Sequence, residues 1–158
     1  MRHFLISLIL LAGAAAAHAQ DYSDPLRLIA SIYRTYTTGN LKPGFPHVYS
    51  GRLPALVNAD AKNTPEGDAG TIDGDVFVDG NDWEISNLKV TLVRRSTLRA
   101  QVRARFDNFE QPRTMIFDLV REKSGWRIDD IGSLRKGARW TMSKILMGAP
   151  DAFPDADK

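Results

Sequence analysis

The sequence contains no cysteine among its 158 residues, which excludes disulfide bridges, thiol catalysis and cysteine-ligated metal sites. Only three histidines are present, and two of them, His3 and His18, lie in the first nineteen residues. His47 is therefore the one histidine left for the rest of the chain. A histidine-rich zinc site is excluded, and a Ser-His-Asp triad is disfavoured. No glycine-rich turn joins a strand to a helix as a phosphate-binding loop requires.

Neither sign of charge is in large excess. The 21 lysines and arginines are nearly balanced by 19 acidic residues, which gives a formal net charge of +2. A nucleic-acid-binding protein needs a strong basic surplus on one face to neutralise phosphates, so we expect no nucleic-acid partner. Hydrophobic residues form 43% and charged residues 25% of the chain, which excludes a coiled coil, a collagen-like chain and overall disorder.

Long apolar runs are missing after the N-terminus. Residues 1–19 combine Arg2, a short apolar run and an alanine-rich end, a pattern typical of a secretory signal peptide cleaved after Ala19. The apolar run is too short for a membrane span. We therefore expect a soluble periplasmic or secreted protein, without a transmembrane segment. Residues 20–147 are predicted to form one domain, and the proline-containing, acidic residues 148–158 a disordered tail.

The first half of the predicted domain has the period of helices. Apolar residues recur at spacings of three and four between Leu26 and Tyr36, which predicts a helix capped by Asp24 and ended by Gly39. A second, shorter helix is predicted from Tyr49, with three residues facing inward: Leu53, Leu56 and Val57. A third helix is expected over Leu134–Met147.

After Trp83 the period changes to two. Alternation of apolar and polar residues predicts strands over residues 88–93, 97–106, 115–120 and 126–131. Their connections are short, so the strands are expected to form an antiparallel meander. The predicted fold is therefore α+β, with N-terminal helices packed on a curved antiparallel sheet of four or more strands. A ligand would fit in the groove between helices and sheet.

An aspartate-rich loop precedes the first predicted strand. Its members are Asp73, Asp75, Asp79 and Asp82, with glycines at two positions between them. A calcium ion takes about six to eight oxygen ligands, so a cation site is one interpretation of this loop. The spacing is not that of an EF-hand, and aspartate and glycine are also common turn residues. A structural loop is therefore the favoured interpretation.

Asp130 is the candidate catalytic base. Strict alternation places it on the same face as Trp126 and Ile128, where it would be a carboxylate in partly apolar surroundings suited to proton abstraction. Tyr33 or Tyr36 would then donate a hydroxyl hydrogen bond to an enolate. In the structural alternative, Asp130 caps a turn or the closing helix, or pairs with an arginine.

Two further groups have both a functional and a structural interpretation. Arginines occupy one face of the second predicted strand: Arg99, Arg103 and Arg105. They could hold an anionic ligand or partner, or form a solvated outer face. Four aromatic residues could line a ligand pocket with Asp130, or belong to the core: Tyr33, Tyr36, Trp83 and Trp126.

Four short sequences together resemble the exported bacterial proteins of domain-of-unknown-function family 3828. They are Ile-Tyr-Arg-Thr-Tyr at 32–36, Val-Tyr-Ser-Gly-Arg-Leu at 48–53, Asp-Gly-Asp-Val-Phe at 73–77 leading to Asp82-Trp83, and Gly-Trp-Arg-Ile-Asp-Asp-Ile at 125–131. That family is similar to the nuclear-transport-factor-2-like superfamily, which also holds ketosteroid isomerases and SnoaL-like cyclases. The resemblance spans residues 24–146 and implies a cone-shaped α+β fold and export, but no common reaction, cofactor or catalytic residue. Some relatives are lipoproteins, and the absence of cysteine argues against a lipid anchor here.

These observations predict an exported domain that binds a small molecule or an envelope protein, without a cofactor and without established catalysis. The alternative is an enzyme of isomerase, hydratase or cyclase type that uses the Asp130 carboxylate and a tyrosine hydroxyl. A homodimer joined through the sheet face is a third interpretation, although the arginines on that face disfavour a dry interface.

Overall fold

The computed structural model describes residues 21–39 and 47–149. The predicted signal peptide and residues 150–158 of the predicted tail lie outside the described residues. The described elements follow one another in the order α1 (Pro25–Thr38), α2 (Arg52–Asn63), β1 (Ile85–Arg95), β2 (Arg99–Asn108), β3 (Gln111–Glu122), β4 (Gly125–Ser133), β5 (Trp140–Thr141) and α3 (Met142–Leu146). None of the helices in this part of the chain is long and apolar enough to span a membrane.

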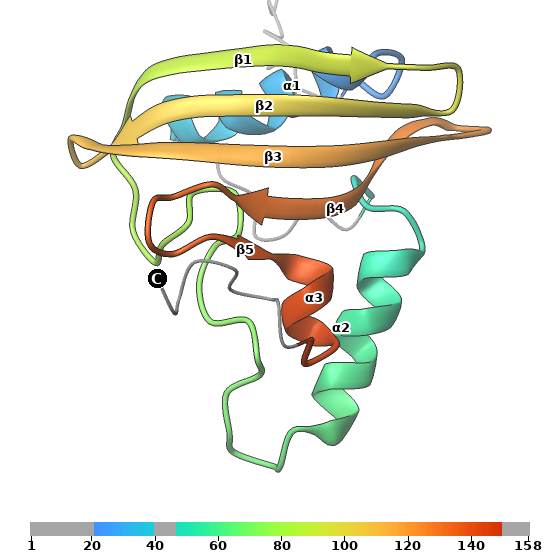
Figure 1. Cartoon of the computed structure of the whole chain (residues 1–158), viewed down its shortest axis with the longest axis vertical. Coiled ribbons are helices and arrows are strands. Elements are labelled where there is room, and N and C mark those ends of the chain that lie inside the picture. Colours follow the sequence, from blue (N-terminus) through green and yellow to red (C-terminus); the bar gives the residue numbers. More distant parts are fainter. Residues whose placement is uncertain (1–20, 40–46, 150–158) are drawn as a thin grey trace, which may run out of the picture.

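The strands form one antiparallel sheet in the order β1-β2-β3-β4-β5 (Figure 1). The predicted α+β class and the predicted antiparallel meander are therefore confirmed. Helix α1 lies across one face of β1 and β2, whereas α2 and α3 lie side by side next to β4 and β5. The opposite face of the sheet is left without a covering helix among the described residues.

Helix α1 begins and ends where local chemistry places it. The Asp24 carboxylate accepts hydrogen bonds from the backbone N–H groups of Leu26 and Arg27, at 2.9 and 3.1 Å. These bonds satisfy donors that have no partner inside the helix. Gly39 follows the last turn with φ of 69°, a left-handed conformation that glycine adopts without steric cost. Both predicted helix ends are thus confirmed.

The core lies between α1 and the sheet. Side chains from α1 meet the inward faces of β2, β3 and β4, and all of the following are fully buried: Leu28, Ile32, Tyr33, Val102, Ala104, Met115, Phe117 and Trp126. The Tyr33 ring lies 5.3 Å from the Phe106 ring and 6.1 Å from the Phe117 ring, measured between centroids. Aromatic rings therefore occupy the space between helix and sheet in which a ligand groove was predicted.

A β-bulge in β4 reverses the predicted orientation of Asp130. Leu119 pairs with Ile128 and Asp118 pairs with Asp130, so one step on β3 corresponds to two steps on β4, with Asp129 as the extra residue. An extra residue moves the following side chains to the other face of a strand. Asp130 therefore lies on the face opposite Ile128, and the prediction that it shares the face of Trp126 and Ile128 is wrong.

Two predictions about the helices are also wrong. Val57 of α2 is 40% exposed rather than inward-facing, whereas Leu53 is buried as predicted. The closing helix covers only Met142–Leu146 instead of Leu134–Met147. Gly137 has φ of 73°, which an α-helix does not admit, and Trp140 and Thr141 pair with β4 as strand β5.

Candidate functional site

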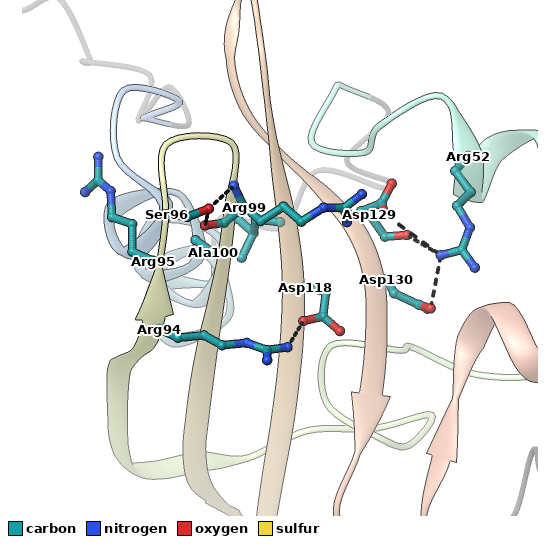
Figure 2. A pocket seen from close by; sticks show the side chains of 10 residues that line it. Arg52, Arg94, Arg95, Ser96, Arg99, Ala100, Asp118, Asp129 and Asp130 are labelled. Atoms are coloured by element: carbon teal, nitrogen blue, oxygen red, sulfur yellow. Dashed lines mark hydrogen bonds and ion pairs between the residues drawn. The ribbon is translucent and has the colours of Figure 1, made fainter.

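A hollow on the sheet face opposite α1 gathers charged side chains from β1, β2, β3, β4 and α2 (Figure 2). Its volume is about 510 Å³, within the range of small-molecule sites. We call it the charged cavity, and it is lined by Arg52, Arg94, Arg95, Ser96, Arg99, Ala100, Leu119, Asp118, Asp129 and Asp130. An adjoining cavity of about 290 Å³ is lined by Gln101, Arg103, Ile116, Asp118, Asp130, Ile131, Gly132, Leu134, Trp140 and Thr141.

Strand register places one polar row across this face. Arg94 of β1 is opposite Gln101 of β2, Gln101 is opposite Asp118 of β3, and Asp118 is opposite Asp130 of β4. The row depends on two bulges. One is the bulge at Asp129, and the other is a register shift between Leu92 and Arg94. Each shift turns a charged side chain onto the face away from the core.

The carboxylates of the charged cavity are paired with donors of the protein. Asp130 accepts hydrogen bonds from the backbone N–H groups of Ile131 and Ser143, at 3.0 and 3.1 Å, and from the Ser143 hydroxyl. Arg52 Nη1 lies 3.3 Å from Asp130 Oδ2, the oxygen that also accepts from the Ser143 hydroxyl, whereas both backbone N–H groups bond Oδ1. Asp129 accepts from the Ser50 hydroxyl at 2.7 Å. Asp130 thus connects β4 to both α2 and α3.

Asp118 is the more exposed carboxylate of the cavity. It accepts a hydrogen bond from Gln101 Nε2 at 2.9 Å, and Arg94 Nη2 lies 3.7 Å from the same oxygen. Arg95, by contrast, points away from the cavity in Figure 2. Its guanidinium bonds Asp24 at 2.8 Å and lies over the Trp126 ring at 5.4 Å. Arg95 is therefore engaged with α1 and the core.

Two of the guanidinium groups that line these cavities, those of Arg99 and Arg103, have no ion-pair partner among the described residues. Arg99 extends across β3 toward Asp129 in Figure 2, but no carboxylate of the described residues lies within 4.0 Å of it. Arg103 in the adjoining cavity has a buried Nε without a hydrogen-bond partner. Since the carboxylates are paired and these two cations are not, the uncompensated charge on this face is positive.

The predicted catalytic constellation is not brought together. Tyr33 Oη donates a hydrogen bond to the Phe77 carbonyl at 2.7 Å, and Tyr36 Oη donates to Asp75 at 2.6 Å. Both tyrosines belong to α1 on the core side of the sheet, whereas Asp130 lines cavities on the opposite side. A proton abstracted by Asp130 would therefore have no tyrosine donor beside it.

The aromatic residues predicted as possible ligand contacts take different places. Tyr33 and Trp126 are fully buried in the core, and Tyr36 is almost so. Trp83 is 37% exposed and packs edge-on against Tyr36, with ring centroids 5.6 Å apart. Of the residues proposed for ligand binding, only Asp130 lines one of the cavities described above.

The aspartate-rich loop uses its carboxylates as structural acceptors. Asp75 accepts from the Tyr36 hydroxyl and, at 2.8 Å, from the backbone N–H of Phe77. Asp79 accepts from Trp140 Nε1 at 2.7 Å, while Asp73 and Asp82 are exposed. Within residues 21–39 and 47–149, no three acidic or histidine side chains form a group that could hold a metal ion. The geometry favours the structural interpretation of this loop.

Buried tyrosines give the protein a predictable alkaline limit. Burial raises the pKa of Tyr33, Tyr36 and Tyr49 above the ordinary value of 10, and the Asp75 carboxylate raises that of Tyr36 further. These raised pKa values leave stability intact below pH 10, and above it the unfolded chain loses protons that the folded chain retains. Each such tyrosine is expected to lower the unfolding free energy by about 1.4 kcal/mol per pH unit. Tyr36→Phe should reduce that slope by about half a proton at pH 10 and by almost one proton at pH 11, measured by urea denaturation at each pH, and an unchanged slope would contradict the assignment.

No protein-family model, curated protein or solved structure matches the chain, so the site is defined by its own geometry. The arginine face of β2 was predicted, but Arg52 and Arg94 were not recognised as members. A signal for one of the two bulges was present in the sequence. The buried residues Ile128 and Ile131 are three positions apart instead of two, which marks an extra residue between them.

Proposed function

We propose that the protein is an exported, non-catalytic binding domain whose charged cavity holds the anionic group of a small ligand. The observation that carries this proposal is the unpaired Arg99 guanidinium in a cavity whose carboxylates already have protein partners. A cation would find no uncompensated negative charge there, and a neutral ligand would leave the Arg99 guanidinium without a counter-charge. An anion would complete the pairing.

The physical chemistry of arginine supports this choice of ligand. A guanidinium presents a planar set of N–H donors that matches a carboxylate or phosphate with two parallel hydrogen bonds. Arg94 on the neighbouring strand makes only a long contact to Asp118 and is well exposed, so it can turn toward a ligand at little cost. The cavity thus offers one free and one readily released guanidinium.

The arrangement of Asp130 supports binding rather than catalysis. Its two oxygens face two backbone N–H groups, one hydroxyl and one guanidinium. These four protein donors already occupy the lone-pair directions of the carboxylate, so neither oxygen is free to approach a proton of a substrate. The isomerase-like alternative is therefore disfavoured by the contacts of the residue on which it depends.

The family resemblance belongs to this proposal as well. We propose membership of domain-of-unknown-function family 3828, within the nuclear-transport-factor-2-like superfamily, and export to the periplasm through residues 1–19. An N-terminal helix packed on an antiparallel meander is compatible with that membership. N-terminal sequencing of protein recovered from the periplasm of a Gram-negative host tests the export step, and an intact Met1 would contradict it.

Arg99→Ala is the direct test of the binding proposal. We expect succinate or inorganic phosphate to bind the native protein in calorimetric titrations and to lose about 10- to 100-fold in affinity in Arg99→Ala, as is typical of a lost hydrogen bond to a charged group. Arg105→Ala is the matched control. Arg105 lies on the same face of the same strand but lines neither cavity, so its loss should change affinity little. Equal losses in both variants would indicate nonspecific attraction and would refute a built site.

A further inference from the structure

We infer that the ligand is an elongated dianion, with one anionic group in the charged cavity and the second in the adjoining cavity. This inference rests on the proposed function and specifies its ligand class. Its premise is that the two cavities form a continuous groove across the outer face of the sheet. They share Asp118 and Asp130, which pair with each other across β3 and β4.

Each end of this groove has its own unpaired guanidinium. Arg99 lines the charged cavity but not the adjoining one, and Arg103 lines the adjoining cavity but not the charged one. Both are in β2, four residues apart and on the same face. At the rise of an antiparallel strand their α-carbons are about 13 Å apart. Two arginines at this spacing, each lining its own cavity, favour an extended molecule with two anionic ends over a single small anion.

The Arg103 guanidinium is the stronger indication of a second anionic group. Its Nε is buried and has no hydrogen-bond partner, as is also true of Arg113 and Arg135. Those two arginines lie within 4.0 Å of the Asp79 carboxylate, whereas Arg103 has no carboxylate of the described residues within that distance. Gln101 lies between the two arginines along β2, but its side chain amide donates to Asp118 rather than compensating either cation. Nothing on this face of the described residues neutralises Arg103.

The middle of the groove restricts the chemistry of the central part of the ligand, which joins the two anionic ends. The Asp118 carboxylate lies between the two arginines and is about half exposed, so it repels negative charge and accepts hydrogen bonds. The adjoining cavity adds the apolar side chains of Ile116, Leu134 and Trp140. The central part of the ligand is therefore an uncharged chain, apolar or carrying N–H or O–H donors, which distinguishes it from a uniformly charged polyanion.

Calorimetric titration with α,ω-dicarboxylates of increasing chain length tests this inference. We expect affinity to rise to an optimum length and then fall, and to exceed that of the monocarboxylate of equal length by 10-fold or more. The best dicarboxylate should lose at least 10-fold in Arg99→Ala and also in Arg103→Ala, and Arg105→Ala should bind as the native protein does. A parallel series of α,ω-bisphosphonates determines which of the two anionic groups the site prefers.

The outcomes separate this inference from the proposed function. If dicarboxylates bind no better than monocarboxylates and Arg103→Ala has no effect while Arg99→Ala weakens binding, the dianion is refuted and the anion site stands. If no carboxylate, phosphate or bisphosphonate binds at any length, both are refuted. Circular dichroism establishes that each variant is folded, and Arg103→Gln replaces Arg103→Ala if the alanine variant does not fold.

Discussion

Replacing Asp79 by alanine is expected to lower the free energy of unfolding by about 3–5 kcal/mol, the cost of leaving a buried charge network without its anion. The Asp79 side chain is only 7% exposed. Its carboxylate accepts hydrogen bonds from Trp140 Nε1 at 2.7 Å and from the Ser133 hydroxyl at 3.0 Å. Arg135 and Arg113 lie within 3.3 and 3.9 Å of the same group as ionic contacts. One side chain thus ties the aspartate-rich loop to β3, β4 and β5.

The expected loss has three physical parts. Without the carboxylate, the Trp140 indole N–H has no acceptor, and the largely buried Arg113 guanidinium has no counter-charge. Asp79 also has φ of 53°, a left-handed conformation that aspartate and asparagine tolerate better than alanine does. Asp79→Asn should therefore cost less than Asp79→Ala, because it retains an acceptor and the conformational tolerance while losing the charge.

Urea denaturation of the two variants gives their free energies of unfolding. Asp79→Asn reports the loss of the charge, and the further loss in Asp79→Ala reports the lost acceptor and the strained backbone. Asp82→Ala is the matched control, since Asp82 belongs to the same loop but is exposed and its side chain has no hydrogen bond or ion pair among the described residues. The control should change stability by no more than about 0.5 kcal/mol. If Asp79→Ala were as stable as Asp82→Ala, the loop would not be anchored through this carboxylate.

The parts of the fold that sequence predicts well are those governed by local chemistry. Helix α1 begins after Asp24 and ends before Gly39. Both residues act on their immediate neighbours, so the helix ends can be predicted from the local sequence alone. The strands can be predicted because burial of one face of the sheet makes apolar and polar residues alternate along each strand. The closing helix was overextended because pairing of Trp140 with Ser133 of β4 is a tertiary contact that no helical stripe reveals.

The candidate site was predictable only in part, and for a related reason. Arg99 and Arg103 follow the alternation of an unbulged strand, so their common face could be deduced from spacing. Arg94 and Asp130 reach that face through bulges, which reverse the alternation. Arg52 comes from α2, and only the folded chain brings it to Asp130.

Replacing Asp130 by alanine is expected to lower the free energy of unfolding by about 2–3 kcal/mol, the typical loss when a charged acceptor is removed from its donors. The variant leaves the Ser143 N–H and hydroxyl without an acceptor, and it removes one of the contacts of Arg52 with β4, the others being those with Asp129. Amide hydrogen exchange at Ser143 should therefore become faster. Asp118→Ala is the control, because Asp118 faces Asp130 across the strands but is about half exposed and should cost less than about 1 kcal/mol.

The direction of this change distinguishes a structural Asp130 from a catalytic one. Carboxylates kept for proton transfer are held in surroundings that do not favour their charge, so their replacement tends to leave stability unchanged or to raise it. Asp130 has the opposite surroundings, with donors on both oxygens from β4, α3 and α2. A clear loss of stability with faster exchange at Ser143 would assign Asp130 to the scaffold that supports the arginines. An Asp130→Ala protein as stable as the native one would reopen the isomerase-like alternative.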